Sequence, residues 1–134
     1  MTNGCYDLLH PGHVDSLQFA RSQGDCLVVG LNSDRSVRQL KGPGRPIVDQ
    51  GGRAEMLAGL DCVDYVVIFD ETSVAGLVAE LRPDVLVKSA EYLPEEVVGH
   101  DIVRQYGGQV VLGPMKSNYS TSELIQRIRQ LDEG

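Results

Sequence analysis

The architecture of this chain is set near its start, by the segment Asn3-Gly4-Cys5-Tyr6-Asp7-Leu8-Leu9-His10-Pro11-Gly12-His13. The segment predicts a short strand, a turn and the start of a helix, because Pro11 suits the first helical position, where an N–H would have no partner. Residues three apart on a helix share a face, so His10 and His13 should point the same way. A helix N-terminus is an anion site, and Gly12 lets a ligand approach the backbone closely. This arrangement suits a nucleoside triphosphate.

Short apolar runs alternate with amphipathic segments along the rest of the chain. The runs are continuous and rich in β-branched residues, which is typical of parallel strands buried on both faces. Caps, glycines and prolines delimit the helices between them. The expected strands are 26–31, 64–69, 84–88 and 109–112, and the expected helices are 13–23, 50–60, 72–81, 94–106 and 121–131. This order predicts one α/β domain over residues 1–134, with a doubly wound, Rossmann-like parallel sheet of about five strands. Ligands of such folds bind beyond the carboxyl ends of the strands, where the opening segment lies.

The first strand departs from this pattern. Met1 and Thr2 alone precede Asn3-Gly4, which predicts a turn, although the first strand of such a sheet should be central. A central strand of two residues would leave backbone groups on both neighbouring strands unpaired. We therefore expect the first strand to be truncated at the N-terminus, with Met1 either a late start or a position inside a longer protein.

Composition limits the class of protein. The net charge of −7 argues against a nucleic-acid or anionic-membrane partner, since both require a basic face. Cys5, Cys26 and Cys62 are odd in number and widely spaced, which favours buried, reduced thiols in a cytoplasmic protein over a disulfide framework or zinc site. No apolar run approaches the ~18 residues of a membrane span, and no signal peptide is present.

At these residues the chain resembles a known family. His10-Pro11-Gly12-His13 matches the HxGH signature of the cytidylyltransferase-like nucleotidyltransferases, and the preceding turn is most similar to the adenylyltransferase domain of bacterial ADP-heptose synthase. The segment from Asn32 to Pro46 resembles the pattern NSDxSVxxLKGxxRP of these synthases. From the residues alone, this basic run favours a solvated helix face over a phosphate site. The resemblance implies that Lys41 holds phosphates on a mobile Gly/Pro loop and that Asp34 orders the rim.

Three later segments extend the resemblance. Arg53 opens an R(x)3L…VD pattern and would support the phosphate site, although an exposed helical arginine is the plain alternative. Lys88 and Glu91 stand where the synthases usually have KGGDY, so this chain departs from the family at the presumed acceptor pocket. Ser120-Thr121-Ser122 resembles an STS motif that grips phosphates, although Ser120 is also an ordinary helix cap. The resemblance thus implies catalytic roles for His10, His13 and Lys41. It implies nucleotide binding by Asn3, Gly4, Cys5, Tyr6, Asp7, Gly12, Asp34, Arg53, Lys88, Glu91, Ser120, Thr121 and Ser122.

The activity implied by the resemblance is transfer of AMP from ATP to a sugar phosphate such as a heptose 1-phosphate, with release of pyrophosphate. Mg²⁺ would be bound through the nucleotide phosphates, and the protein would be a homodimer. CTP with glycerol 3-phosphate is the rival substrate pair, because the same front motif serves both. A nucleotide-binding module without turnover is a second alternative. A flavodoxin-like electron carrier is disfavoured. Such a protein needs aromatic residues on both sides of the flavin ring, and this chain has no Trp and only two Phe.

Overall fold

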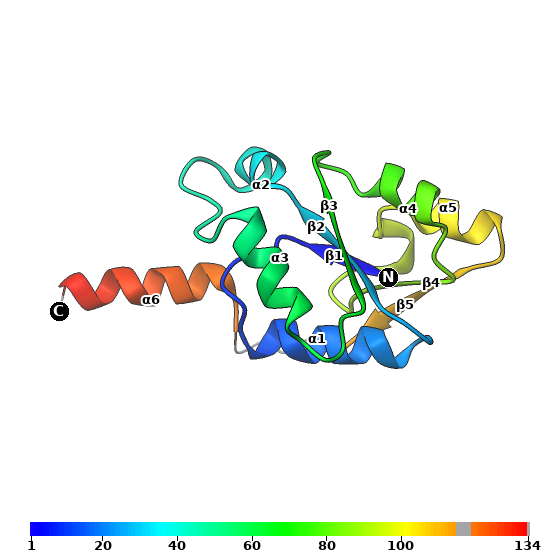
Figure 1. Ribbon diagram of the computed structural model, residues 1–134, viewed down its shortest axis with the longest axis horizontal. Helices are drawn as coiled ribbons and strands as arrows, with labels where there is room; N and C mark the ends of the chain where they lie inside the picture. Colours follow the sequence, from blue (N-terminus) through cyan, green and yellow to red (C-terminus); the bar gives the residue numbers. More distant parts are fainter. Residues whose placement is uncertain (115–118, 134) are drawn as a thin grey trace.

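The computed structural model describes residues 1–114 and 119–133, and its centre is a twisted parallel sheet (Figure 1). Strands β1 and β2 pair in parallel, β2 pairs with β3, and β4 pairs with β5. Backbone hydrogen bonds from Met1 join β1 to β4, so the strands follow the order β3-β2-β1-β4-β5. The strands are β1 (Thr2–Gly4), β2 (Val28–Asn32), β3 (Tyr65–Phe69), β4 (Val85–Ser89) and β5 (Gln109–Gly113). This is the predicted doubly wound α/β fold, with β1 at the centre.

Strand β1 differs from the sequence-based expectation. Asn3 and Gly4, expected in a turn, belong to the strand, where they pair with Gly30 and Leu31 of β2. On the other side, the Met1 amino group donates to the Val85 carbonyl and the Val87 N–H donates to the Met1 carbonyl, both at 2.8 Å. The short strand therefore has hydrogen-bond partners on both sides, and the expected unpaired neighbours do not occur at these positions.

The helices also depart from their predicted bounds. The basic run after β2 is itself a helix, capped by the Ser33 hydroxyl, which accepts from the Ser36 N–H at 3.2 Å. The single helix expected at 94–106 is interrupted at Gly99, which has a φ of +95° that favours glycine. The helix expected from residue 72 starts at Ala75. The helical elements are α1 (Pro11–Ser22), α2 (Asp34–Lys41), α3 (Gln50–Ala58), α4 (Ala75–Leu81), the short 3-10 helix η1 (Pro94–Glu96), α5 (His100–Gln105) and α6 (Thr121–Glu133).

Two apolar clusters cover the two faces of the sheet. Val29 and Leu31 of β2 pack with residues of α1 and α3 on one face. Leu86 of β4 packs with residues of α4 and α5 on the other. Because successive side chains of a strand point to opposite faces, Val87 joins the first cluster while its neighbour Leu86 joins the second. Packing on both faces thus fixes the strands relative to one another, so that their carboxyl ends form one edge of the sheet.

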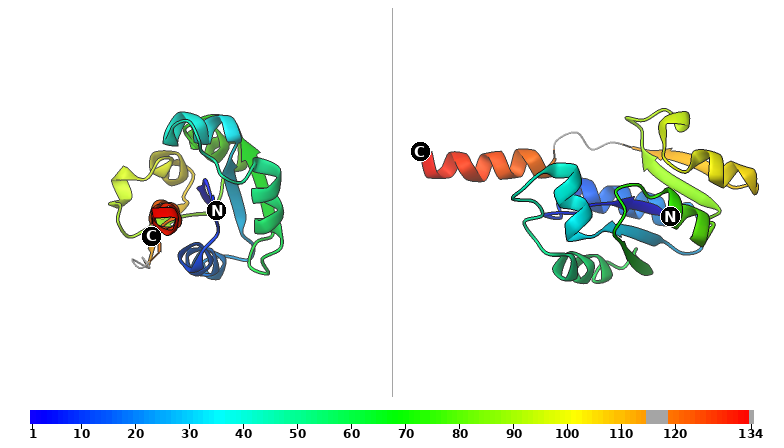
Figure 2. Two further views of the ribbon diagram at one scale, coloured as in Figure 1. Left: turned by 90° about the vertical axis from the view of Figure 1, so that its left-hand side faces the viewer. Right: turned by 90° about the horizontal axis from the view of Figure 1, so that it is seen from above.

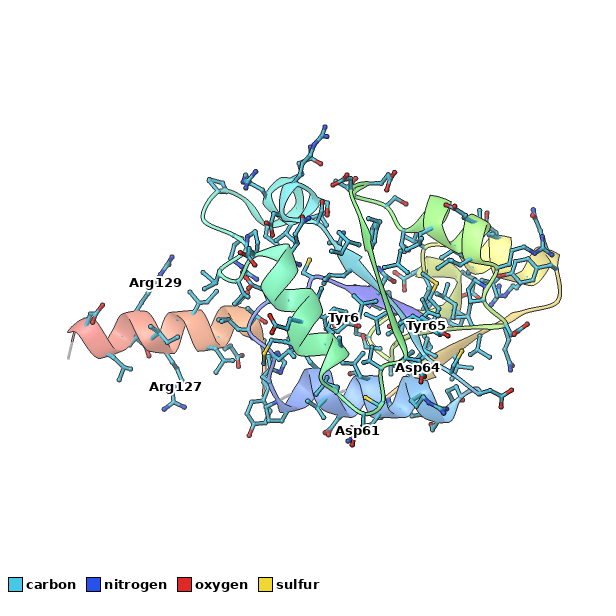
Figure 3. All side chains as sticks on the ribbon, in the orientation of Figure 1. Tyr6, Asp61, Asp64, Tyr65, Arg127 and Arg129 are labelled. Carbon is cyan, nitrogen blue, oxygen red and sulfur yellow. The ribbon has the colours of Figure 1, made fainter. Side chains whose placement is uncertain are left out.

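Helix α6 projects away from this three-layered body (Figure 2). Its side chains Ile128 and Leu131 are 57% and 79% exposed. Arg127 and Arg129 point outward from the helix (Figure 3). The first turn of α6 nevertheless lies at the carboxyl edge of the sheet, where its residues line the cavity described below.

Candidate functional site

The turn after β1 places both histidines. Tyr6 and Leu8 adopt φ values of 50° and 55°, which reverse the chain before α1. Tyr6 is buried, and its ring lies 5.4 Å from the His13 ring, centroid to centroid. Burial raises the pKa of the Tyr6 hydroxyl to about 12, so it stays neutral. The Tyr6 ring therefore acts as a fixed apolar support beneath the start of α1.

His10 and His13 form the N-terminal cap of α1. His10 Nδ1 accepts from the Gly12 N–H at 3.1 Å, and His13 Nδ1 accepts from the His10 N–H at 3.3 Å. This reciprocal pattern is a capping box built from two imidazoles. Since each Nδ1 accepts a hydrogen bond, each neutral ring carries its proton on Nε2. Both rings line the cavity, and they stack with centroids 3.8 Å apart.

Burial keeps these rings neutral. Burial lowers the pKa of His10, and burial together with the neighbouring His10 lowers the pKa of His13 to about 4, against an opposing effect of Asp7. At neutral pH the pair therefore presents two neutral Nε2–H donors at a helix N-terminus, an arrangement suited to anionic oxygens.

Asp7 connects the histidine turn to two other segments. Its carboxylate is 1% exposed and accepts from the Ile47 N–H at 2.8 Å, the Val48 N–H at 3.0 Å and Arg45 Nε at 3.1 Å. Its carbonyl oxygen accepts from the Thr121 hydroxyl at 2.7 Å. One residue thus fixes the segment between α2 and α3 and the first turn of α6.

Arg53 lies beneath the site and not in it. The side chain is 1% exposed, and its guanidinium donates to three carbonyl oxygens, those of Cys5, Asn32 and Val48, at 2.7 to 2.9 Å. Its fourth bond is an ion pair with the Asp34 carboxylate at 2.8 Å. Neither Arg53 nor Asp34 is among the residues that line the cavity. Nucleotide binding by these two residues stays a prediction; the contacts show that they hold the end of β1 against the end of β2, which is in line with a supporting role.

Lys41 lines the cavity, but from a different element than expected. It is the last residue of α2, not part of a loop, and its side chain is exposed. Gly42 follows with a φ of 96°, which ends the helix. A cation at a helix C-terminus is favoured by the helix dipole, so the position of Lys41 is set by α2 itself.

Lys88 occupies the floor of the cavity at the end of β4. Its ammonium donates to the Asn3 carbonyl at 3.0 Å, and burial lowers its pKa. Beside it, Asn3 Oδ1 is the single buried side-chain oxygen or nitrogen that has no hydrogen-bond partner within residues 1–114 and 119–133. The Ser89 hydroxyl donates to Glu91 at 2.9 Å, so the departure from KGGDY creates a side-chain pair at the rim.

The start of α6 forms the opposite wall. Ser120 caps the helix by accepting from the Glu123 N–H at 3.1 Å, and Thr121 bonds to Asp7 as described above. Ser122 is exposed and lines the cavity. The residues that precede this turn, 115–118, lie outside the described part of the chain.

These walls enclose a cavity of about 870 Å³ at the carboxyl edge of the sheet. Every predicted site residue except Asp34 and Arg53 lines it. The sequence-based site did not include several residues that line the cavity, and Arg45 is the basic one among them. Arg45 belongs to the matched xxRP pattern, and its positive charge could have identified it as a phosphate-binding candidate. The other missed residues are Ser16, Asn32, Leu40, Thr72, Ser89, Tyr92 and Tyr119.

Two further expectations concern the cysteines and the membrane. Cys26 is exposed and Cys5 and Cys62 are half-buried, so the expected set of buried thiols is wrong. Cys5 lines the cavity. Within the described residues, no helix is both long and apolar enough to cross a membrane, and no cluster of three His, Cys, Asp or Glu side chains could hold a metal ion.

Comparison with known proteins assigns the class that this fold and site define. The family model "Cytidylyltransferase-like" matches residues 1–127, so the chain belongs to that family of nucleotidyltransferases. It is 56% identical over 95% of its length to "Bifunctional protein HldE" of Syntrophotalea carbinolica, and 57% identical over 95% to the protein of that name in Geobacter metallireducens. The predicted resemblance to the adenylyltransferase domain of ADP-heptose synthase is thereby confirmed. The chain spans about a quarter (26%) of the length of these relatives.

A solved structure has the same fold. The lipopolysaccharide core biosynthesis protein from Thermoplasma volcanium superposes with a TM-score of 0.68 and 25% sequence identity. The match covers 90% of this chain and 96% of the other. The parallel α/β fold is therefore shared with a protein of nearly the same length.

Proposed function

We propose that this domain transfers AMP from ATP to a sugar phosphate such as a heptose 1-phosphate and releases pyrophosphate. The protonation of the two histidines supports this most strongly. In both His10 and His13, Nδ1 accepts a hydrogen bond from a backbone N–H, so Nε2–H stays available as a donor in residues that line the cavity. Two neutral donors at a helix N-terminus match the charge that develops on an α-phosphate during transfer.

In the proposed reaction, an acceptor phosphate oxygen attacks the α-phosphorus in line. The new O–P bond forms as the bond from the α-phosphorus to the bridging oxygen breaks, and pyrophosphate takes up the electron pair. No protein nucleophile is needed, because positioning and charge stabilisation dominate such transfers. His10 and His13 donate to α-phosphate oxygens, and Lys41 neutralises the departing pyrophosphate.

The remaining walls suit the other parts of the substrates. Backbone N–H groups in the first turn of α6 and the hydroxyls of Ser120 and Ser122 would hold the β and γ phosphates. Lys88, with Asn3 Oδ1 unpaired beside it, would receive polar groups of the acceptor. Mg²⁺ would enter with the triphosphate, because it binds phosphate oxygens and few protein groups. No side-chain cluster suited to a resident metal is found in residues 1–114 and 119–133.

A matrix of nucleotides against phosphorylated acceptors tests the proposal by measuring pyrophosphate release. We expect ATP with a sugar 1-phosphate to be the most active pair. Higher activity with CTP and glycerol 3-phosphate would favour the rival substrates. Tight ATP binding without release for any acceptor would indicate a nucleotide-binding module and contradict the proposal. His13→Ala serves as the inactive control in each arm.

We further propose that the protein is a homodimer. The exposed apolar residues Ile128 and Leu131 of α6 support this, since a single chain leaves them in water. Sedimentation at several protein concentrations measures the state directly. A monomer at all concentrations would contradict it.

A further inference from the structure

We propose that Arg45 holds the leaving pyrophosphate, and that Asp7 is the residue that positions it. This inference rests on the proposed nucleotidyl transfer and adds a phosphate-binding residue to it. Its starting point is an arginine on the cavity wall whose charge and hydrogen-bonding groups the reaction outlined above does not use.

The orientation of the Arg45 guanidinium is fixed from one side. Its side chain is 17% exposed, and Nε donates to Asp7 Oδ2 at 3.1 Å. The Asp7 carboxylate cannot turn away, because it is 1% exposed and also accepts the N–H groups of Ile47 and Val48. Arg45 is therefore held in place before any ligand arrives, which removes part of the entropy cost of binding.

The Nη groups of the Arg45 guanidinium have no protein partner within the described ranges 1–114 and 119–133. Arg45 lines the cavity, and Asp7 is the one hydrogen-bond partner found there for its side chain, while its backbone N–H donates to the Gly42 carbonyl at 3.4 Å. Its Nη1 and Nη2 groups keep four N–H donors in a planar fork. Donors left unpaired at a partly buried position are costly, and phosphate oxygens satisfy this fork in bidentate fashion.

The connections of Asp7 indicate which phosphate Arg45 meets. The Asp7 carboxylate holds Arg45, while its carbonyl oxygen accepts from Thr121 in the first turn of α6. Arg45 and the N-terminus of α6 therefore lie around the same residue and line the same cavity. With the α-phosphate at the histidine pair, the β and γ phosphates fall between Arg45 and α6.

The ion pair with Asp7 defines how Arg45 acts. The pair is neutral overall, so Arg45 contributes directed N–H donors more than net positive charge. Lys41, exposed on the same cavity wall and without an ion-pair partner among the described residues, supplies the charge. A lysine at position 45 would lack both the Nε bond and the fork, so the two residue types are not interchangeable there.

Calorimetric titration of the folded protein tests this, with inorganic pyrophosphate, ATP and AMP as probes in the presence of Mg²⁺. Arg45→Met should weaken binding of pyrophosphate and ATP by ~10-fold or more, because hydrogen bonds to charged groups are involved, and should leave AMP within about twofold. Arg38→Met is the matched control, since Arg38 is exposed on α2 and does not line the cavity. It removes the same charge and should leave all three affinities within about twofold.

Two further variants separate positioning from simple folding defects. Arg45→Lys should weaken pyrophosphate binding by an intermediate factor. Asp7→Asn and Arg45→Met should combine non-additively, because Asp7 acts through Arg45. Melting curves identify any variant that is unfolded. If Arg45→Met or Asp7→Asn is unfolded, the pyrophosphate affinity of Arg45→Lys is the measurement that decides.

The outcomes distinguish this inference from the proposed function. Unchanged pyrophosphate affinity in Arg45→Met, or a loss confined to AMP, would overturn the role of Arg45. A wild-type protein that binds pyrophosphate and ATP but releases no pyrophosphate with any acceptor would overturn the proposed function instead. In that case the binding titrations still decide whether Arg45 holds a diphosphate.

Discussion

The two walls of the cavity are built in different ways. On the β1–α1 side, Asp7, His10 and His13 are each hydrogen-bonded to backbone groups, and Arg53 braces the strand ends below them. On the opposite side, the Thr121 hydroxyl donates to the Asp7 carbonyl, and the Tyr119 ring stacks on the His10 ring with centroids 6.1 Å apart. The β1–α1 side, called here the histidine wall, is thus organised by buried hydrogen bonds before ligand binds, whereas side-chain contacts from Tyr119 and Thr121 attach the start of α6 to it.

Substitution of Arg53, which joins the ends of β1 and β2 below the histidines, should have the largest effect on stability. Arg53→Met leaves three carbonyl oxygens without their donor, and it removes the ion-pair partner of Asp34, which is 31% exposed. We expect the free energy of unfolding to fall by about 3–5 kcal/mol, because each unsatisfied acceptor in a buried position costs about 1–3 kcal/mol. Urea titration measures the loss, with the exposed Arg38→Met as control. A loss below about 1 kcal/mol would show that the histidine wall does not depend on Arg53.

Removing either imidazole should affect the chemistry more than the fold. His10→Ala or His13→Ala should lower kcat by at least ~10²-fold, because each removes a donor to the developing charge. His100→Ala is the matched control, since His100 begins α5 and does not line the cavity. Steady-state pyrophosphate release gives the comparison. Near-normal kcat in His13→Ala would remove that residue from the proposed mechanism.

Acid should weaken the histidine wall in a defined range. Burial lowers the pKa of His13 to about 4 in the folded protein, whereas an ordinary histidine has a pKa of 6.5. Between these values the unfolded chain binds a proton that the folded chain does not, so the free energy of unfolding falls as the pH drops from 6.5 to about 4. An NMR titration of the His13 ring should give a midpoint near 4. A midpoint near 6.5 would contradict the burial argument, and His13→Ala should show a shallower loss of stability over the same range.

The smallest effect is expected at α6. Thr121→Val removes the hydroxyl that bonds to the Asp7 carbonyl and should cost about 1 kcal/mol. Hydrogen exchange should quicken in the first turn of α6 and stay unchanged in α1. Ser122→Ala, one residue further on and exposed, is the control for stability. Equal exchange in both variants would show that α6 is held by other contacts.

The fold was largely predictable because its signals are local. The continuous apolar run 26–31 became the inner strand β2, whose residues 29–32 are buried, as expected for a covered parallel sheet. The run 64–69 became the edge strand β3, where Tyr65 and Ile68 are 62% and 41% exposed, so burial on both faces was wrong for that strand. The failures have local causes too. The residues of α2 alone favoured a solvated helix face, and the family resemblance replaced that interpretation with a phosphate loop. The helix expected at 94–106 is interrupted at Gly99, whose positive φ cannot be inferred from hydrophobic periodicity.

The candidate site was predicted less evenly. His10 and His13 could be predicted as site residues because the helix start, the three-residue spacing and the HxGH motif all lie within residues 10–13. Arg53 was predicted to support the phosphate site, but its contacts were not predictable, because the carbonyl groups of Cys5 and Asn32 come together with Arg53 only in the folded chain. Arg45 was missed for the same reason: its fixed orientation depends on Asp7, 38 residues earlier.

The histidine cap also constrains how this protein can change over evolutionary time. The imidazoles that would take part in the reaction are also the groups that begin α1, so selection for folding and selection for activity act on the same two positions. Serine or aspartate at position 10 would cap the helix as well or better, and would remove the proposed donor. A lineage that lost the need for the reaction should therefore replace these histidines with better caps, and that pattern would mark former enzymes among its relatives.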